Sequence, residues 1–281
     1  ATLRAWERRY GVPQPARSDA RYRLYSERDL GRVRRMASLC AGGLRPAEAA
    51  RTVRAQTTPP IAPSTSADEE GAERIVDAVR ALDVDALRAA LEVGLATGNA
   101  AHAYDVVIAP ALRRIGDLWA RGELSIANEH AGSHIVRDLL STLLRLATPP
   151  PPAPAVVLAC FDEEQHELGL LGFALHVASW GYRPLFLGAR VPPAALGEAI
   201  ATHRPALVGI GMVVAPPTDD TRAVLSAYGK ACGAVPWIVG GPGSLHAAEH
   251  VRRRGGVVAP ADLGEVRALF DRLARHRRRP P

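Results

Sequence analysis

The sequence predicts a multidomain protein of the α and α/β classes: an N-terminal helical segment, a four-helix bundle and a C-terminal flavodoxin-like doubly wound parallel sheet. Three observations support this prediction. The chain has 281 residues, enough for two or three domains with buried cores. Proline-rich stretches at 57–67 and 149–154 separate segments of different pattern. Beyond the second stretch, short apolar runs alternate with helical segments, as βαβ units require.

Residues 1–56 are predicted to form short helices in a basic domain. This segment has thirteen Arg and five acidic residues, in a chain of formal net charge +6. Ser26 is placed to cap a helix over 27–40, and Pro46 opens another. Such a concentration of positive charge suits a nucleic-acid surface, although a high-GC chain that uses Arg in place of Lys would look similar. The chain opens with Ala1 in mid-pattern, so we expect its true N-terminus to lie upstream.

Residues 57–67 are predicted to be a linker, and residues 68–147 four helices with short turns, which together indicate a helical bundle. Asp83 is placed to cap the second helix. The third helix spans 102–119, and Pro110 either kinks it or marks its start. The fourth covers 124–146.

Residues 154–276 are predicted to form the parallel α/β domain. The expected strands are five apolar runs: 155–160, 184–187, 206–212, 237–239 and 257–258. Such a sheet has right-handed crossovers and binds ligands outside the carboxyl ends of its strands.

The loop after the first expected strand argues against a phosphate site and favours a cation. Carboxylates at 162, 163, 164 and 167 would repel a pyrophosphate, and the loop has no glycine-rich phosphate motif. His166 stands where strand gives way to helix, and a ligating imidazole there would donate its other N–H to Glu164 or Asp162. Gly169 leaves space for a bulky group. The alternatives are a solvated loop or a receiver-type phosphoacceptor, but the only lysine, Lys230, falls on an expected helix.

Trp119, Glu129 and His130 are expected to converge near a helix–helix turn of the bundle. They would offer a flat apolar face with two polar handles, which suits a ligand that is partly hydrophobic. The plainer alternative is a core tryptophan beside a solvated Glu-His pair. His130 and His134 could also bind zinc, but no third ligand is evident.

Gly240 and Gly241 follow the fourth expected strand. Glycines there remove side chains from the ligand edge of the sheet and would admit a flat group, while a tight strand-to-helix turn explains them equally well.

The composition indicates a cytoplasmic protein. No apolar stretch approaches the roughly 20 residues of a membrane span, and no signal peptide is visible. Cys40, Cys160 and Cys232 are odd in number and far apart, so they are no disulfide framework.

Three motifs in this order resemble those of CarH/LitR-type regulators, which are MerR-family photoreceptor-repressors with a cobalamin-binding domain. Glu164-x-His166-x-x-Gly169 resembles the cobalamin-binding motif of methionine-synthase-type domains. The spacing from Trp119 to Glu129-His130 resembles the motif that covers the adenosyl face of the cofactor. Residues 2–11 and 21–25 are similar to a MerR winged helix.

The resemblance implies adenosylcobalamin as the cofactor, with His166 as the lower cobalt ligand. Trp119, Glu129 and His130 would cap the upper face. The remaining cofactor-binding residues would be Glu164, Gly169, Val213, Gly240 and Gly241. The DNA-binding residues would be Arg4, Arg8, Arg9, Tyr22 and Arg23.

The resemblance also implies a repressor that is not an enzyme, responds to light through its cofactor, binds an operator and self-associates as a dimer or tetramer by a population shift. The chain departs from the family pattern at several points. The first helix of the helix-turn-helix is absent, residues 209–214 contain no hydroxyl where a serine pattern is usual, the loop around His166 is unusually acidic, and Ala120 replaces a histidine that captures cobalt in some members. The alternatives are therefore a regulator that binds another tetrapyrrole such as a bilin, a regulator without a cofactor, and a corrinoid carrier or methyltransferase subunit.

Overall fold

The computed structural model describes residues 66–95, 99–214 and 218–276, and positions 6–7, 9–13, 15–17, 23–24, 33, 36, 40, 45–47 and 50 nearer the N-terminus. The chain divides into two compact units, Ala1–Ala62 and Pro63–Pro281. The second unit contains both the helical bundle and the parallel sheet. These two parts, expected as separate domains, therefore form one compact unit.

The N-terminal unit contains a short antiparallel hairpin, in which β1 (Ala16–Arg17) pairs with β2 (Arg23–Leu24). The helices read directly from residues 1–56 do not include this hairpin, because strand pairing joins residues that are not local in sequence, but the hairpin agrees with the winged helix that the resemblance implies. Nearby residues form a small apolar core: Val12, Met36 and Ala50, with Trp6, Tyr10 and Cys40 packed against them.

The bundle consists of α4 (Ser66–Arg80), α5 (Val84–Leu95), α6 (Ala100–Ala103), the π-helical turn η1 (Tyr104–Ile108), α7 (Ala109–Ala120) and α8 (Ile126–Ala147). Short polar side chains cap the start of three of these segments, and of these the sequence predicted Asp83. Asp83 accepts the amide of Ala86 at 2.9 Å, and Ser125 accepts that of Asn128 at 3.2 Å. Asn99 caps α6 in the same way at 3.0 Å.

Two predicted boundaries in this region need refinement. Ser66 and Ala67, expected in the linker, lie in α4, because Asp68 and Glu69 in the first turn stabilise an earlier helix start. Pro110 is the second residue of α7, and because α7 follows η1 without a break, its missing N–H falls beside the π turn inside a continuous helical segment.

The C-terminal half of the unit is the predicted doubly wound sheet. Its strands are β3 (Ala155–Cys160), β4 (Arg183–Gly188), β5 (Leu207–Gly211), β6 (Trp237–Gly240) and β7 (Val257–Val258). They are parallel and ordered β4-β3-β5-β6-β7. The helices are α9 (Leu168–Ser179), α10 (Pro193–His203), α11 (Thr218–Cys232), α12 (Ala248–Arg253) and α13 (Leu263–His276), with a 3₁₀ turn η2 (Pro242–Leu245) after β6. The order confirms the flavodoxin-like topology.

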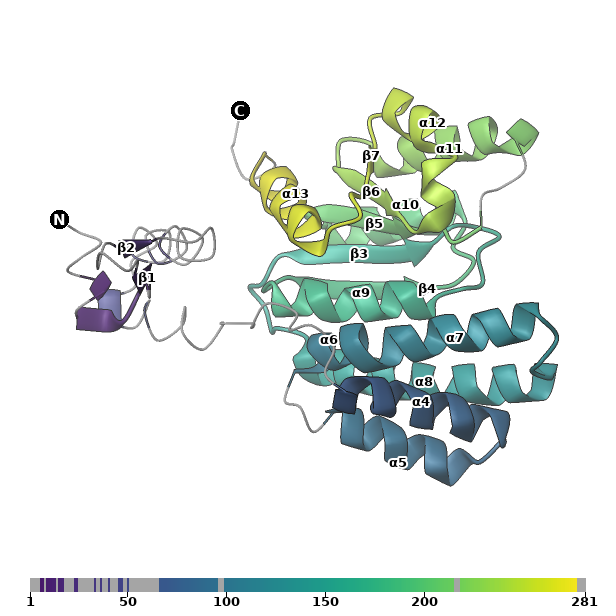
Figure 1. Cartoon of the computed structure of the whole chain (residues 1–281). Helices are drawn as coiled ribbons and strands as arrows, with labels where there is room; N and C mark the ends of the chain where they lie inside the picture. The colour runs from purple at the N-terminus through teal and green to yellow at the C-terminus, as the bar shows by residue number, and fades with distance from the viewer. Residues whose placement is uncertain are drawn as a thin grey trace. The chain divides into compact units, whose positions relative to one another are not determined.

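The helices cover both faces of the sheet, and the bundle packs against one of these helices. Residues of α10, α11 and α12 form a core on one face, while α9 and α13 cover the other. Helix α9 lies between the strands and the bundle (Figure 1), and its apolar residues share one continuous core with the bundle helices. Because α9 is buried on both sides, it is apolar around most of its circumference.

Two side chains of η1 join the bundle to α9. The ring of Tyr104 fits against Gly172, where an added Cβ would lie 2.0 Å from the ring. Asp105 accepts a hydrogen bond from His176 Nε2 at 2.9 Å. Neighbouring residues of an α-helix point about 100° apart, and the wider π turn lets both of these side chains reach α9.

Within the described ranges, no helix combines the length and apolarity needed to cross a membrane.

Candidate functional site

The candidate site lies at the carboxyl end of the sheet, where the loops after β3 and β5 meet. The next two strands along the chain lie on opposite sides of β3: β4 on one side and β5 on the other. In open α/β sheets, the crevice at such a switch point is where ligands bind.

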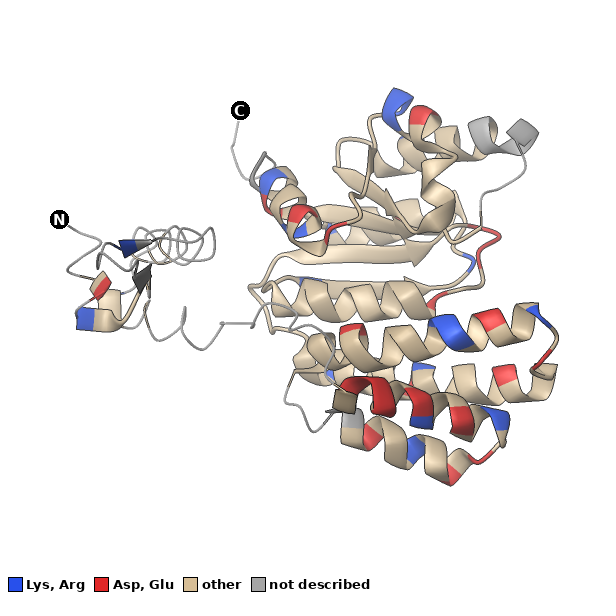
Figure 2. Cartoon of the chain, viewed as in Figure 1, with Lys and Arg blue, Asp and Glu red and all other residues tan. Residues whose placement is uncertain are grey.

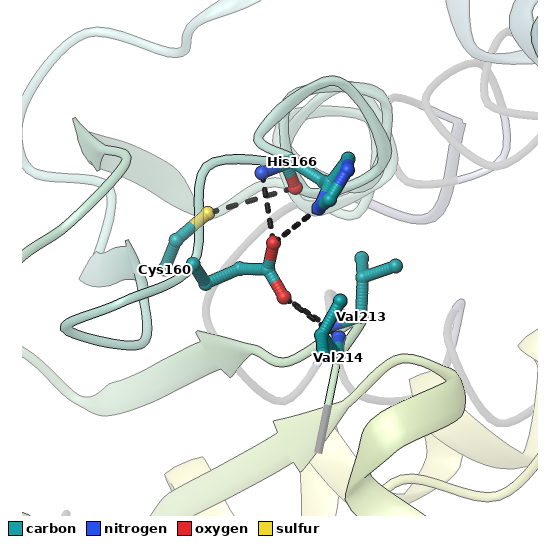
Figure 3. A network of polar contacts seen from close by, with 5 residues as sticks. Cys160, His166, Val213 and Val214 are labelled. Atoms are coloured by element: carbon teal, nitrogen blue, oxygen red, sulfur yellow. Dashed lines mark hydrogen bonds and ion pairs between the residues drawn. The ribbon is translucent and has the colours of Figure 1, made fainter. Parts of the chain in front are cut away.

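A buried carboxylate organises this edge. Glu164 is only 4% exposed, and its two oxygens accept four hydrogen bonds. One oxygen accepts from the amide of His166 at 2.9 Å and from its Nδ1 at 2.5 Å. The other accepts from the amides of Val213 at 2.7 Å and Val214 at 2.8 Å (Figure 3). Glu164 therefore ties the loop after β3 to the end of β5.

The surroundings of Glu164 keep it ionised. Burial by itself would raise its pKa, but the amides of Val214, His166 and Val213 and the imidazole of His166 donate to the charged form. Their combined effect lowers the pKa below its ordinary value.

His166 presents one ring nitrogen to the outside. Its side chain is 66% exposed, while Nδ1 is held by Glu164. With the proton on Nδ1, the lone pair of Nε2 points away from the carboxylate and is available to a metal, which is the usual arrangement of a ligating histidine. The sequence left Asp162 and Glu164 as alternative partners, and the structure selects Glu164.

Cys160 lies beneath this loop and is not suited to ligation. Its thiol is buried, with Sγ 3.9 Å from the carbonyl oxygen of His166. Burial, followed by the charges of Glu164 and Glu167, raises the pKa of Cys160 to about 12. It therefore stays a neutral thiol, which is a poor metal ligand.

The bundle side of the site is the turn between α7 and α8. Trp119 lies in the last turn of α7 and is 52% exposed. Glu129 lies in the first turn of α8, where one carboxylate oxygen accepts from Ser133 Oγ at 2.6 Å and the other contacts His130 Nδ1 at 2.5 Å. His130 is 75% exposed, so its Nε2 also faces outward.

Glu129 on the bundle edge is held in its charged form. Burial would raise the pKa of Glu129, but Ser133, His130 and the positive charge of His166 lower it overall. Glu129 is therefore ionised at neutral pH, as Glu164 is.

Glycines occupy the face of the sheet that meets α9 and α13. Gly211 stands in register with Cys160 on β3 and Gly240 on β6. An added Cβ at Gly211 would lie 3.4 Å from Leu170 Cβ, and an added Cβ at Gly169 would meet nothing within 4 Å. The start of α9 is therefore open at Gly169, whereas the sheet at Gly211 is covered by the side chain of Leu170.

The backbone conformation at position 241 itself requires glycine. Its φ is +103°, and an added Cβ would lie 2.4 Å from the carbonyl oxygen of Met212. The tight-turn explanation therefore holds for Gly241 whether or not it also contacts a ligand.

Sequence reasoning missed several residues of this site. Val214 and Ser133 complete the hydrogen bonds of Glu164 and Glu129. Glu167 forms an ion pair with Arg137 of α8 at 2.6 Å. The position of Arg137, seven residues after His130, is a signal that could have placed it on the same helix face.

The DNA-binding candidates lie in the N-terminal unit. Arg4, Arg8 and Tyr22 fall outside the described residues. Arg9 is exposed, whereas Arg23 Nε forms an ion pair with Glu7 at 2.7 Å.

The zinc alternative has no support in the described residues, in which no group of three or more His, Cys, Asp or Glu side chains is arranged to hold a metal. A metal at His166 would therefore have to arrive with most of its own ligands, as it does in a macrocycle.

The fold and the site define a class: a flavodoxin-like sheet with a helical cap, preceded by a basic N-terminal unit. Residues 72–144 match the family model described as B12 binding domain, and residues 1–56 match MerR HTH family regulatory protein. The chain is 35% identical to the HTH-type transcriptional repressor CarH of Myxococcus xanthus over 88% of this chain and 86% of that protein. It is 36% identical to the repressor CarA of the same organism over 90% of this chain and 84% of that protein. The chain belongs to the family of HTH-type transcriptional repressors that contains CarH and CarA.

A solved structure shows the same fold at low identity. The monomethylamine corrinoid protein of Methanosarcina barkeri matches with a TM-score of 0.56 and 14% identity, over 73% of this chain and 99% of that protein. This likeness confirms the arrangement of a helical bundle on a parallel α/β domain.

Proposed function

We propose that this chain is a transcriptional regulator, not an enzyme, that binds DNA through its N-terminal unit and adenosylcobalamin between the loop after β3 and helix α8. The observation that carries the proposal is the pairing of His166 with the buried Glu164, which leaves Nε2 of an exposed imidazole pointing away from that carboxylate. Membership of the repressor family supports the regulatory role.

The residues present fit a corrinoid. His166 supplies one nitrogen donor with the correct tautomer, which is the single ligand that a macrocyclic cobalt requires from below. Val213 and Val214 are exposed apolar side chains next to it, and the open space at Gly169 leaves room beside α9. Gly211 and Gly240 line the layer in which a nucleotide tail would lie, and Leu170 and Ala259, whose Cβ atoms pack against them, would have to move aside.

The roles of the site residues follow from their positions. His166 would hold cobalt from below, and Glu164 would keep the proton on Nδ1. Trp119, Glu129 and His130 would cover the upper face from the bundle. Bound adenosylcobalamin would supply a cobalt–carbon bond that light can break.

The bundle edge is the part that would respond to this chemistry. Trp119 is half exposed and lies near a helix end. It would contact the adenosyl group of the cofactor, so loss of that group would leave its ring without a packing partner. The change would shift the population between two placements of the bundle, and with it the self-association that presents several DNA-binding units. We place this activity in the cytoplasm, where the operator lies.

An absorption spectrum tests the proposal directly. Purified protein should bind adenosylcobalamin in the dark with a His-ligated spectrum, and illumination should change both the spectrum and the elution volume. H166A should shift the spectrum toward a water-ligated, base-off form. Protein that takes up a bilin but no corrinoid would establish the other-tetrapyrrole alternative instead.

DNA binding has its own test. Because Arg side chains neutralise phosphates, affinity for duplex DNA should fall steeply with salt, and R9A should reduce that slope by about one unit. A salt response that is flat would show that the basic segment is only a solvated surface.

A further inference from the structure

Glu167 connects the candidate cofactor loop to the bundle. It directly follows His166, and its side chain is only 14% exposed. One oxygen forms an ion pair with Arg137 Nε of α8 at 2.6 Å, and the other accepts the amide of Ala189 at 3.0 Å. Three segments, the start of α9, the loop after β4 and α8, therefore meet at one carboxylate.

The carboxylate occupies a fitted position. Gly188 has a φ of +85°, and an added Cβ there would lie 2.9 Å from the oxygen of Glu167 that bonds Ala189. The backbone of the β4 loop thus approaches the side chain closely. An ion pair built in this way differs from a pair of solvated surface charges, which contribute little.

Arg137 also fixes where the rest of α8 lies. Arg137 and His130 are seven residues apart, which places them on one helix face about 10 Å apart along the axis. An anchor at Arg137 therefore determines how far Glu129 and His130 stand from His166.

The second attachment of the bundle differs in character. At the Asp105–His176 contact the side chains are only 20% and 8% exposed, and the ring of Tyr104 is enclosed at Gly172. Arg137 is 51% exposed. The buried contact is the harder one to break, because separation would leave buried polar groups unpaired. Movement of the bundle away from the loop would therefore open first at Arg137.

We propose that Arg137 and Glu167 are positioning residues that hold the bundle edge against the loop that carries His166, and that this closed edge is the state that binds the cofactor. The proposal rests on the proposed function for the identity of the cofactor. The closure itself is a property of the protein alone and can be measured without any ligand.

Hydrogen exchange on the cofactor-free chain tests the closure. In R137M and in E167Q, peptides covering 161–168 and 186–191 should exchange about fivefold faster, the factor that corresponds to about 1 kcal/mol for one ion pair. The double variant should exchange no faster than either single one, because both remove the same contact. The matched control is R114M, which removes the exposed Arg114–Glu73 pair within the bundle and should leave both peptides unchanged.

Salt and cofactor provide two further measurements. The wild-type exchange rate of these peptides should rise with ionic strength, whereas that of R137M should not, because no ion pair remains to be screened. Adenosylcobalamin should bind R137M more weakly by up to the same factor, with an unchanged His-ligated spectrum. Exchange rates in R137M equal to those of the wild type would overturn the proposal. Failure of the wild-type chain to bind cobalamin would instead overturn the proposed function. The hydrogen-exchange rates would still test the closure, because they are measured without a ligand.

Discussion

Glu164 offers the sharpest test of how this site works, through the substitution Glu164→Gln. The glutamine has the same shape, but its amide accepts hydrogen bonds on one side only. The four N–H groups that now meet the carboxylate come in two pairs, one from His166 and one from Val213 and Val214. One pair must therefore face the NH₂ group of the glutamine, donor against donor.

The magnitude follows from this count. A hydrogen bond to a charged group contributes about 1.5–3 kcal/mol, so loss of one pair costs about 3–6 kcal/mol. His166 is exposed, and water can reach its side of the carboxylate, so we expect the lower end, about 3 kcal/mol. For a unit of this size that lowers the melting temperature by roughly 6–12 °C.

The substitution should also reverse the tautomer of His166. If the glutamine carbonyl faces Val213 and Val214, its NH₂ group favours an unprotonated Nδ1, and the proton moves to Nε2. Nε2 then has no lone pair for cobalt, and affinity for adenosylcobalamin should fall about 10–100-fold, as it does when carboxylates behind other metal ligands are removed.

Thermal unfolding of the cofactor-free chain and an absorbance titration with adenosylcobalamin measure the two effects. E163Q, a change at the exposed neighbouring residue, is the control and should alter neither. A normal melting temperature together with normal affinity in E164Q would refute the reasoning. The stabilisation should also depend on pH. Because the folded-state pKa of Glu164 is lowered, its contribution is present at neutral pH and disappears as the pH falls through that lowered value, in wild type but not in E164Q.

Two further predictions concern the contact between the bundle and α9. Gly172→Ala places a Cβ within 2.0–2.3 Å of three ring atoms of Tyr104, so overpacking should destabilise the fold by about 1–3 kcal/mol or more, and Tyr104→Ala in the same chain should recover part of the loss in thermal unfolding. Asp105→Ala leaves the buried His176 without its partner and should lower the urea midpoint by an amount equivalent to about 1–3 kcal/mol; identical midpoints would show that His176 finds another partner.

The fold was largely predictable, because its signals are local. Five apolar runs marked the strands, and the run at 155–160 coincides with β3. Asp83 marked the start of the second bundle helix as a cap. The strand pair 16–17 and 23–24 followed only from the resemblance to a winged helix, since two strands of two residues each leave almost no periodic pattern.

The candidate site was predictable only in part. The residue types around His166 indicated a ligand and a carboxylate behind it, but two acids had suitable spacing. The choice of Glu164 depends on the amides of Val213 and Val214, which come from the loop after β5 and satisfy the second oxygen. No local pattern records such a contact. The roles of Trp119 and His130 at a cofactor remain predictions.

The sequence alone determined the order of the helices and strands. It also determined that the His166 loop follows the first strand of the sheet and that glycines lie along the edge of that sheet. These features depend on hydrophobic period, helix capping and backbone freedom, which act between near neighbours. Tertiary structure alone decided that the bundle and the sheet form one unit, that Tyr104 fills the space at Gly172, and that Glu167 reaches Arg137. Those outcomes depend on which surfaces meet. Each surface is formed by residues that lie tens of positions apart in the sequence and come into contact only in the folded chain.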